Sequence, residues 1–328
     1  MMRVLPAALL LLAMASLPAS AFDCARASTD TEKLICSDTA LKASDDAMGA
    51  AWKRLGDLLD KDGMQAMRAS QRAWLKMRDD RCGYGETAER VQCLKQATQE
   101  RTLILSGAAR TGPGAGSLMV PFALHRPGSK KTYQVDIAGV RFADPQAPGE
   151  RAFNKMVDDA IEASPLSETI DFESFGELAY NESTVVEYAG PQLISALSSV
   201  WRYDGGAHGN YYSTGHHFSP QDGELSYPML FGETAANELA EACRDGLARP
   251  DGGEILSAQE RSETLFEDSL AVFVEQIKNL GIWSFDAQGA RVHFAPYAIA
   301  SYASGEFECR LPLDLLNRLS KAPQYLPQ

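Results

Sequence analysis

Six cysteines restrict how this chain of 328 residues can fold, because four of them fall within its first hundred residues. The chain begins with Arg3 and an apolar run, residues 4–17, which is too short to span a bilayer and leads into a small-residue cleavage site. This pattern predicts a secretory signal peptide over residues 1–21, cleaved after Ala21. An exported chain with an even number of cysteines is expected to form disulfides rather than a thiolate metal site.

The spacing of the cysteines favours one pairing without excluding others. Fifteen connectivities are open to six cysteines. Pairing within each region is the most economical arrangement, since two cysteines lie far downstream of the other four. We therefore expect three disulfides, with the first two open to exchange of partners: Cys24–Cys36, Cys82–Cys93 and Cys243–Cys309.

A glycine- and proline-rich stretch divides the sequence, and we expect a linker over residues 107–124. The charge balance changes across it. Residues 22–107 carry 14 basic and 14 acidic side chains, whereas residues 108–328 carry 16 basic and 30 acidic ones. The sequence therefore predicts two domains, residues 22–106 and 125–328.

The net charge of −13 narrows the classes of partner. Phosphate attraction needs clustered Lys and Arg, so we expect no nucleic-acid ligand, and the chain lacks the polybasic segment that anionic lipids attract. No stretch after the signal peptide reaches membrane-spanning length. We expect a periplasmic or secreted protein without a membrane span in its mature form.

Residues 22–106 have the pattern of a small all-α domain. Apolar side chains recur at helical spacing in a first stripe, which consists of Leu41, Met48, Trp52, Leu55 and Leu59. Asp38 or Ser37 is placed to cap this helix, and residues 60–63 end it. Stripes that start at Met64 and Val91 predict two further helices. Three helices bury little core, so two disulfides would contribute needed stability, about 2–4 kcal/mol each.

Residues 125–328 mix strand and helix patterns, which predicts an α+β domain. Alternating apolar residues predict strands at residues 133–137, 185–188, 194–201 and 307–311, and helical spacing predicts helices at residues 150–163, 235–247 and 265–280. Cys309 lies on the apolar face of the last strand, and Cys243 lies on the apolar face of a helix. A helix packed on a sheet would bring these two thiols together.

The first region resembles the N-terminal domain of LprI-type lysozyme inhibitors. The residues that carry the resemblance are 22–24, 32–38, Leu41, 71–75, Arg78, Asp79, Cys82, Cys93 and Leu94. They include both the cysteine spacing and the sequence Arg72-Ala73-Trp74-Leu75.

The second region resembles the extracellular part of the anti-sigma factor RsiV, which is also found beside the catalytic domain of PdaC-type peptidoglycan deacetylases. The resemblance rests on residues 203–211 and 294–305, with Phe218, Leu230 and Phe231. It implies an α+β domain that, in RsiV, recognises lysozyme. This chain has neither a sigma-binding segment nor a deacetylase domain, so those two activities are not carried over.

Aromatic and glycine-rich loops are the candidate binding surface, because tyrosine-rich loops make contact area at low entropic cost. The candidate partner-binding residues are Tyr203, Asp204, Gly205, Gly206, His208, Asn210, Tyr211, Pro296, Tyr297 and Tyr302. The glycines, and Asn210, suit left-handed or tight backbone turns. No nucleophile signature, phosphate loop or cofactor motif accompanies them.

We interpret the protein as an exported binding protein, not an enzyme, that recognises and inhibits lysozyme or a related basic cell-wall hydrolase by covering its cleft. The first alternative is an envelope module that binds peptidoglycan or another glycan directly. The second alternative is a metal-assisted hydrolase that uses His208, His216 or His217. Against that alternative, the glycines predict a turn, and His216 and His217 would face opposite sides of a strand.

Overall fold

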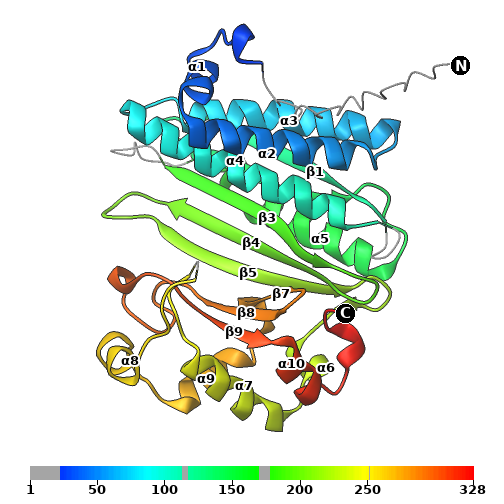
Figure 1. The fold of residues 1–328 in the computed structure, drawn as a ribbon, viewed down its shortest axis with the longest axis vertical. Coiled ribbons are helices and arrows are strands. Elements are labelled where there is room, and N and C mark those ends of the chain that lie inside the picture. The colour runs from blue at the N-terminus through cyan, green and yellow to red at the C-terminus, as the bar shows by residue number, and fades with distance from the viewer. Residues whose placement is uncertain (1–22, 113–116, 170–177, 251) are drawn as a thin grey trace, which may run out of the picture.

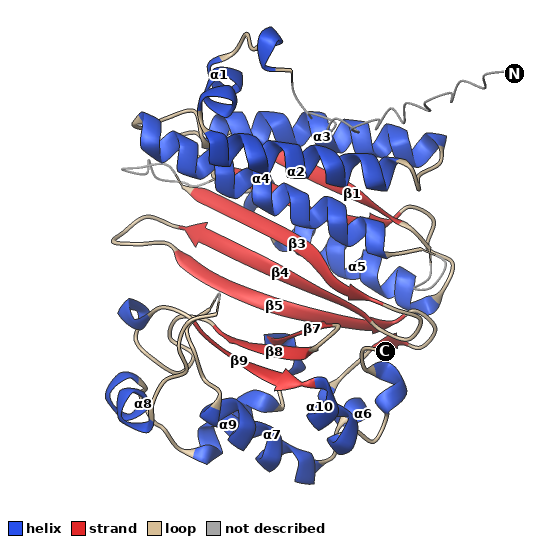
Figure 2. Ribbon diagram, in the orientation of Figure 1, coloured by secondary structure: helices blue, strands red, loops and turns tan. Residues whose placement is uncertain are grey.

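The computed structural model describes residues 23–112, 117–169, 178–250 and 252–328, so the predicted signal peptide lies outside the described residues. A six-stranded sheet runs through the middle of the molecule (Figure 1). The N-terminal helices contact β1, β2 and β3, and a three-stranded sheet with further helices contacts β3, β4 and β5, so the two groups lie above and below the large sheet in the view of Figure 2. The predicted fold class, an all-helical N-terminal region followed by an α+β region, is confirmed.

Four α-helices form the N-terminal region. The predicted cap is confirmed, because the Asp38 side chain accepts a hydrogen bond from the backbone N–H of Leu41 at 2.8 Å. The first helix was not predicted, and a capping box between Thr29 and Glu32 begins it. The helices are α1 (Asp30–Ser37), α2 (Thr39–Gly56), α3 (Lys61–Arg81) and α4 (Thr87–Arg110).

The six strands of the large sheet pair in chain order. All neighbours are antiparallel except β2 and β3, which are parallel because α5 (Pro148–Ala163) returns the chain between them. The predicted strands and helix in this part of the chain are confirmed. The strands are β1 (Met119–Arg126), β2 (Gln134–Phe142), β3 (Ala179–Ala189), β4 (Ile194–Tyr203), β5 (Asn210–Ser219) and β6 (Gly223–Glu224).

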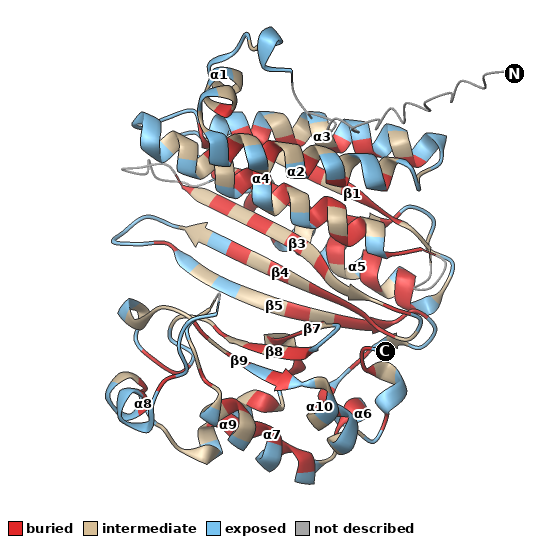
Figure 3. Ribbon diagram, in the orientation of Figure 1, coloured by how far each residue is buried: buried red, intermediate tan, exposed pale blue. Residues whose placement is uncertain are grey.

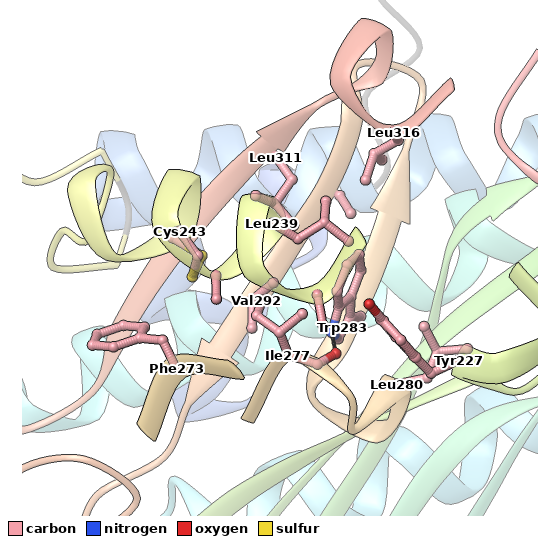
Figure 4. Close-up of a cluster of buried hydrophobic side chains, with 14 of the residues drawn as sticks. Tyr227, Leu239, Cys243, Phe273, Ile277, Leu280, Trp283, Val292, Leu311 and Leu316 are labelled. Atoms are coloured by element: carbon pink, nitrogen blue, oxygen red, sulfur yellow. Dashed lines mark hydrogen bonds between the residues drawn. A yellow bond between two sulfur atoms is a disulfide. The ribbon is translucent and has the colours of Figure 1, made fainter. Parts of the chain in front are cut away.

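The C-terminal part builds the small sheet and covers it with helices. Its strands are β7 (Trp283–Asp286), β8 (Gly289–Phe294) and β9 (Phe307–Pro312). Its helices are α6 (Tyr227–Leu230), α7 (Glu233–Asp245), α8 (Ala258–Thr264), α9 (Leu270–Ile277) and α10 (Leu313–Leu319). Buried side chains around Trp283, Leu239 and Phe273 form a core of their own between helices and sheet (Figure 4).

The predicted helix at residues 265–280 is wrong over its first turn. Leu265 instead forms an isolated bridge with Ala300, so α9 begins only at Leu270, after the Ser269 side chain accepts from the N–H of Val272. The helix ends at Ile277. The apolar pattern continues beyond both ends because Leu265 and Leu280 join the same core, Leu280 as the first residue of a separate 3-10 helix, Leu280–Ile282.

The structure confirms the three expected disulfides: Cys24–Cys36, Cys82–Cys93 and Cys243–Cys309. The third joins α7 to β9, as the two apolar faces predicted. The first two close loops with sequence separations of 12 and 11 residues, whereas the third spans 66.

The predicted linker over residues 107–124 differs from the structure. The chain up to Arg110 completes α4, and residues 119–124 form most of β1, while residues 113–116 lie outside the described residues. The inner faces of α2–α4 are buried (Figure 3) and share one hydrophobic cluster with the large sheet. At Gly107, α4 comes so near to β3 that a Cβ would lie 2.9 Å from the carbonyl oxygen of Val186. Glycine therefore allows this packing, and the low-complexity composition was misleading.

The two sheets meet through buried polar and aromatic groups. The Ser195 hydroxyl of β4 accepts the backbone N–H of Phe285 of β7 at 2.9 Å. A Cβ at Gly215 would lie 1.8 Å from the carbonyl oxygen of Trp283, so only glycine permits the two backbones to approach here. Next to it, His217 packs edge-on against Phe285, with 5.0 Å between the ring centroids.

Candidate functional site

The structure brings together the two loops that the sequence singled out. The β4–β5 loop holds residues 204–209 and the β8–β9 loop holds residues 295–306. The Tyr302 hydroxyl donates to the carbonyl oxygen of Gly209 at 2.8 Å, and the Tyr302 ring stacks on His208 with 3.7 Å between centroids. Two segments about ninety residues apart in the sequence therefore form one surface.

Local interactions define the shape of the β4–β5 loop. Gly205 and Gly206 have φ angles of 91° and 102°, in the left-handed region that the glycines predicted. The Asp204 carboxylate accepts from the Tyr133 hydroxyl at 2.5 Å and from Arg202 at 2.7 Å. Partial burial opposes ionisation, but these hydrogen bonds outweigh it and lower the pKa of Asp204. The carboxylate therefore holds the loop, and partner binding by Asp204 stays a prediction.

Tyr297 has the most unusual backbone in the β8–β9 loop. Its φ is 71°, the only positive φ among the described non-glycine residues, and it follows Pro296. Its side chain is 57% exposed, and its ring lies 5.5 Å from that of Tyr302. Strained backbone that presents an exposed aromatic ring is a feature of binding loops.

The other candidate residues lie at the base of the β4–β5 loop. Tyr203 stacks on Trp201 with 6.2 Å between centroids, and its hydroxyl donates to the carbonyl oxygen of Gly206. Asn210 begins β5 and is exposed. Tyr211 is half-buried, and its hydroxyl donates to Ser199 at 3.2 Å. Tyr211 therefore belongs to the sheet rather than to the loop surface.

The two loops contact further exposed aromatic residues that the sequence did not single out. Trp201 is 37% exposed and contacts Gly209, where a Cβ would lie 2.6 Å from the indole ring. The backbone N–H of Phe266, 66% exposed, donates to the carbonyl oxygen of Ile299 in the β8–β9 loop. We call the following set the aromatic strip: Tyr84, Trp201, Tyr203, His208, Phe266, Tyr297 and Tyr302.

The aromatic strip reaches from the helical region to the C-terminal region. Tyr84, in the α3–α4 loop, is 82% exposed and lines the same cavity as Trp201. At the other end, exposed carboxylates accompany Phe266 in and around α8: Glu254, Glu260, Glu263 and Glu267. Large exposed aromatic side chains that lie close together mark candidate docking surfaces.

His216 and His217 do lie on opposite faces of β5, and neither is placed for metal chemistry. Burial lowers the pKa of His217 to about 3 and that of His216 to about 4. The ring nitrogens of His217 lie 3.1 Å from the Ser195 hydroxyl and 3.1 Å from the carbonyl oxygen of Leu280. In the described parts of the chain, no group of three or more His, Cys, Asp or Glu side chains could hold a metal ion.

Sequence reasoning missed a cavity of about 520 Å³ between α3, α4 and the large sheet. Arg101, fully buried, lines it. One signal could have found it, because Arg101 occupies a core position in the apolar stripe that Leu94, Ala97, Ile104 and Ala108 form along α4. An arginine among core positions is unusual and indicates a special environment.

Two protein-family models match the chain, one in its N-terminal region and one in its C-terminal region. Residues 24–105 match the family model described as "Lysozyme inhibitor LprI", which confirms the resemblance of residues 22–106. Residues 230–314 match "Protein of unknown function (DUF3298)", which is compatible with the RsiV-type resemblance. All six strands of the large sheet lie between the two matched ranges. Among curated proteins, none matches the sequence.

The solved structures that are similar to this chain include two members of the DUF3298 family. A member of the DUF3298 family from Bacteroides fragilis is 11% identical with a TM-score of 0.42, and the similarity covers 63% of this chain and 95% of that one. A DUF3298 family protein from Pseudomonas aeruginosa is 15% identical with a TM-score of 0.42, covering 67% and 99%. TM-scores of this size do not establish a shared overall fold.

None of the described helices is long and apolar enough to cross a membrane.

Proposed function

We propose that this protein is an exported binding protein that docks on lysozyme, or on a related basic cell-wall hydrolase, through the aromatic strip and inhibits it. The observation that carries the choice of partner is the match of residues 24–105 to the lysozyme inhibitor LprI family. The three disulfides support a location outside the cytoplasm, in the periplasm or beyond.

The extent of the aromatic strip along the chain supports its role as the docking surface. It begins at Tyr84, inside the part of the chain that matches LprI, and ends at Phe266 and Tyr297, inside the part that matches DUF3298. One partner can therefore contact both matched regions at once. Rigid aromatic side chains give most of the binding energy in many interfaces.

Charge supports a basic partner. The net charge of −13 attracts a basic protein from a distance, and this attraction raises the association rate more than the final affinity. The exposed carboxylates around α8 stand beside Phe266 and add a local negative field. Inhibition then follows by occlusion, because glycoside hydrolases cleave between two carboxyl groups in an open cleft that a projecting loop can cover.

Titration of the purified protein with lysozyme tests this proposal. We expect a complex whose affinity weakens as the ionic strength rises above about 0.1 M. Tyr297→Ala and Phe266→Ala are each expected to weaken binding at least about tenfold, or about 1.4 kcal/mol. Tyr84→Ala tests the end of the strip in the helical region in the same assay.

Tyr212→Ala is the matched control. Tyr212 is 45% exposed and lies on β5 next to Tyr211, but it is outside the aromatic strip, so its loss should leave the affinity unchanged. Equal binding by wild type and Tyr297→Ala would remove the strip from the docking surface. Absence of a complex at low salt would overturn the proposed partner.

A further inference from the structure

The cavity between the helices and the large sheet is large enough for a small ligand. Its volume of about 520 Å³ lies within the usual range for small-molecule sites, about 300–1,000 Å³. α3 and α4 form one wall, and β2, β3, β4 and β5 form the other. Tyr84 and Trp201 of the aromatic strip line it as well, but the cavity does not include the β8–β9 loop.

A row of side chains crosses five strands on the sheet side of the cavity. Residues that pair between neighbouring strands point to the same face. The pairing places in one row His125, Asp136, Asn181, Trp201 and Tyr211. The row begins on β1 and β2 with the imidazole of His125 and the carboxyl group of Asp136, and it ends on β4 and β5 with the aromatic rings of Trp201 and Tyr211.

The carboxylates that line the cavity are already engaged. Asp136 and Asp80 lie 2.6 Å and 2.8 Å from the two ring nitrogens of His125. Glu100 pairs with Arg81 at 3.1 Å, and Glu182, which also lines the cavity, accepts a hydrogen bond from the Tyr180 hydroxyl at 2.7 Å. These acids therefore leave no ready site for an ammonium group, which makes a zwitterionic amino acid a poor ligand here.

Arg101 is the opposite case, a buried cation that lacks an anion. Its Nε and Nη2 donate to Gln71 and to Ser70, both at 3.0 Å, and neither of those residues lines the cavity. Its Nη1 has no hydrogen-bond partner, and no carboxylate forms an ion pair with it, within the described ranges. A buried guanidinium group is stable when a carboxylate or phosphate accepts its free N–H groups.

Asn181 provides a second unsatisfied group on the facing wall. It stands in the middle of the row on β3, between Asp136 and Trp201. Its Oδ1 is buried and, among the described residues, has no hydrogen-bond partner. This oxygen accepts hydrogen bonds only, so it fits a ligand with a hydroxyl or amide N–H group.

We propose that this cavity binds a saccharide that carries a carboxylate. Arg101 binds the carboxylate, Asn181 accepts from a hydroxyl or amide N–H, and the rings of Trp201 and Tyr211 pack on the C–H face of the sugar ring. Acidic amino sugars of the cell wall and uronic acids share this chemistry. The inference goes beyond docking on a hydrolase and does not depend on it.

An NMR titration with three sugars tests the proposal. The resonances of the indole N–H groups of Trp74 and Trp201 report on the two walls of the cavity. N-acetylmuramic acid and glucuronic acid carry a carboxylate, whereas N-acetylglucosamine does not. We expect the wild-type protein to bind at least one acidic sugar at least tenfold more tightly than N-acetylglucosamine. The acidic sugar that binds more tightly identifies the source of the natural ligand: the cell wall for N-acetylmuramic acid, or a uronate glycan for glucuronic acid.

Variants separate this site from the docking surface. Asn181→Leu changes the cavity but not the aromatic strip, and Trp201→Leu removes the ring on which the sugar packs; each should weaken binding of the acidic sugar at least tenfold. Arg101→Lys is used because removal of the buried charge could unfold the chain. It keeps the charge but removes the guanidinium group, so it should reduce the preference for the acidic sugars over N-acetylglucosamine. Tyr297→Ala should leave sugar binding unchanged.

Three results would overturn the proposal. The first is no change in the indole resonances with either acidic sugar at about 10 mM, since weaker binding than this is not specific recognition. The second is equal affinity for N-acetylmuramic acid, glucuronic acid and N-acetylglucosamine. The third is wild-type affinity in both Asn181→Leu and Trp201→Leu.

Discussion

The large sheet supports two regions through contacts of different kinds. Ser195 and Trp201 are six residues apart on β4, so they point to the same face of the sheet. At Ser195 the small sheet packs through the backbone N–H of Phe285, which donates to the Ser195 hydroxyl, and through the ring of Phe285, which packs against His217. At Trp201 the helices leave a cavity edged by ion pairs and the buried Arg101. The first contact is built for rigidity, whereas the second retains polar groups and volume that a ligand can use.

Removal of the long-range disulfide should distinguish the two regions most strongly. A crosslink stabilises a fold mainly by restricting the unfolded chain, and more so for a longer loop. The double variant Cys243→Ala with Cys309→Ala should therefore lose about 4 kcal/mol in the free energy of unfolding. The corresponding change at Cys24 and Cys36 should lose about 3 kcal/mol. Urea unfolding of both variants measures the difference, and equal losses would contradict the loop-length argument.

Gly215→Ala should break the contact between the sheets. Its Cβ would lie 1.8 Å from the carbonyl oxygen of Trp283, so the two backbones must separate, with an expected loss of about 3 kcal/mol or more. Gly107→Ala should lose less, because its clash with Val186 is milder and alanine favours the helix. Thermal unfolding compares the two. Gly232→Ala, where no atom lies within 4 Å of the added Cβ, is the control and should change stability little.

His125→Ala should loosen the helical region alone. The change removes the group that joins Asp80 on α3 to the buried Asp136 on β2. Hydrogen bonds to charged groups contribute about 1.5–3 kcal/mol, so we expect a loss of about 2 kcal/mol. Hydrogen exchange should become faster in α3 and stay unchanged in β7. Faster exchange in both would show that the two contacts are not independent.

Acid should weaken the contact between the sheets. Burial lowers the pKa of His217 to about 3 and that of His216 to about 4, whereas the unfolded chain takes up these protons near pH 6.5. The unfolded state therefore binds more protons, and stability should fall as the pH drops from about 6.5 toward 4, by up to about 1.4 kcal/mol per pH unit for each histidine.

The cavity side should respond in the opposite direction. Burial raises the pKa of Asp136, in spite of its hydrogen bond to His125, so its protonation favours the folded state as the pH falls.

Urea unfolding of wild type and His217→Gln between pH 7 and pH 5 measures the effect of the contact between the sheets. An identical pH slope in both proteins would rule out His217 as its source.

Local patterns predicted the elements well, whereas contacts between distant elements escaped prediction. Asp38 was identified as a cap and the Cys243–Cys309 disulfide was expected, because capping and strand alternation are local properties. Helical periodicity tells which face of α4 is buried, but not that it packs on β3 through Gly107. For the same reason the sequence placed a linker where α4 and β1 join the large sheet.

The candidate site was predicted in its parts but not as a whole. Each loop was found from its aromatic and glycine residues, yet nothing in the sequence shows that Tyr302 stacks on His208. The cavity was missed because it lies between two regions that the sequence divides into separate domains. Arg101 alone indicated it, as a charge at a core position of a helix.

The most direct test of the proposed function is the lytic activity of lysozyme on cell-wall substrate, measured at low salt as the purified protein is added. We predict that activity falls to a low plateau near one equivalent, that added salt restores it, and that Tyr297→Ala inhibits much less than Tyr212→Ala. Full lytic activity in the presence of excess protein, for lysozyme and for other basic cell-wall hydrolases, would contradict the account.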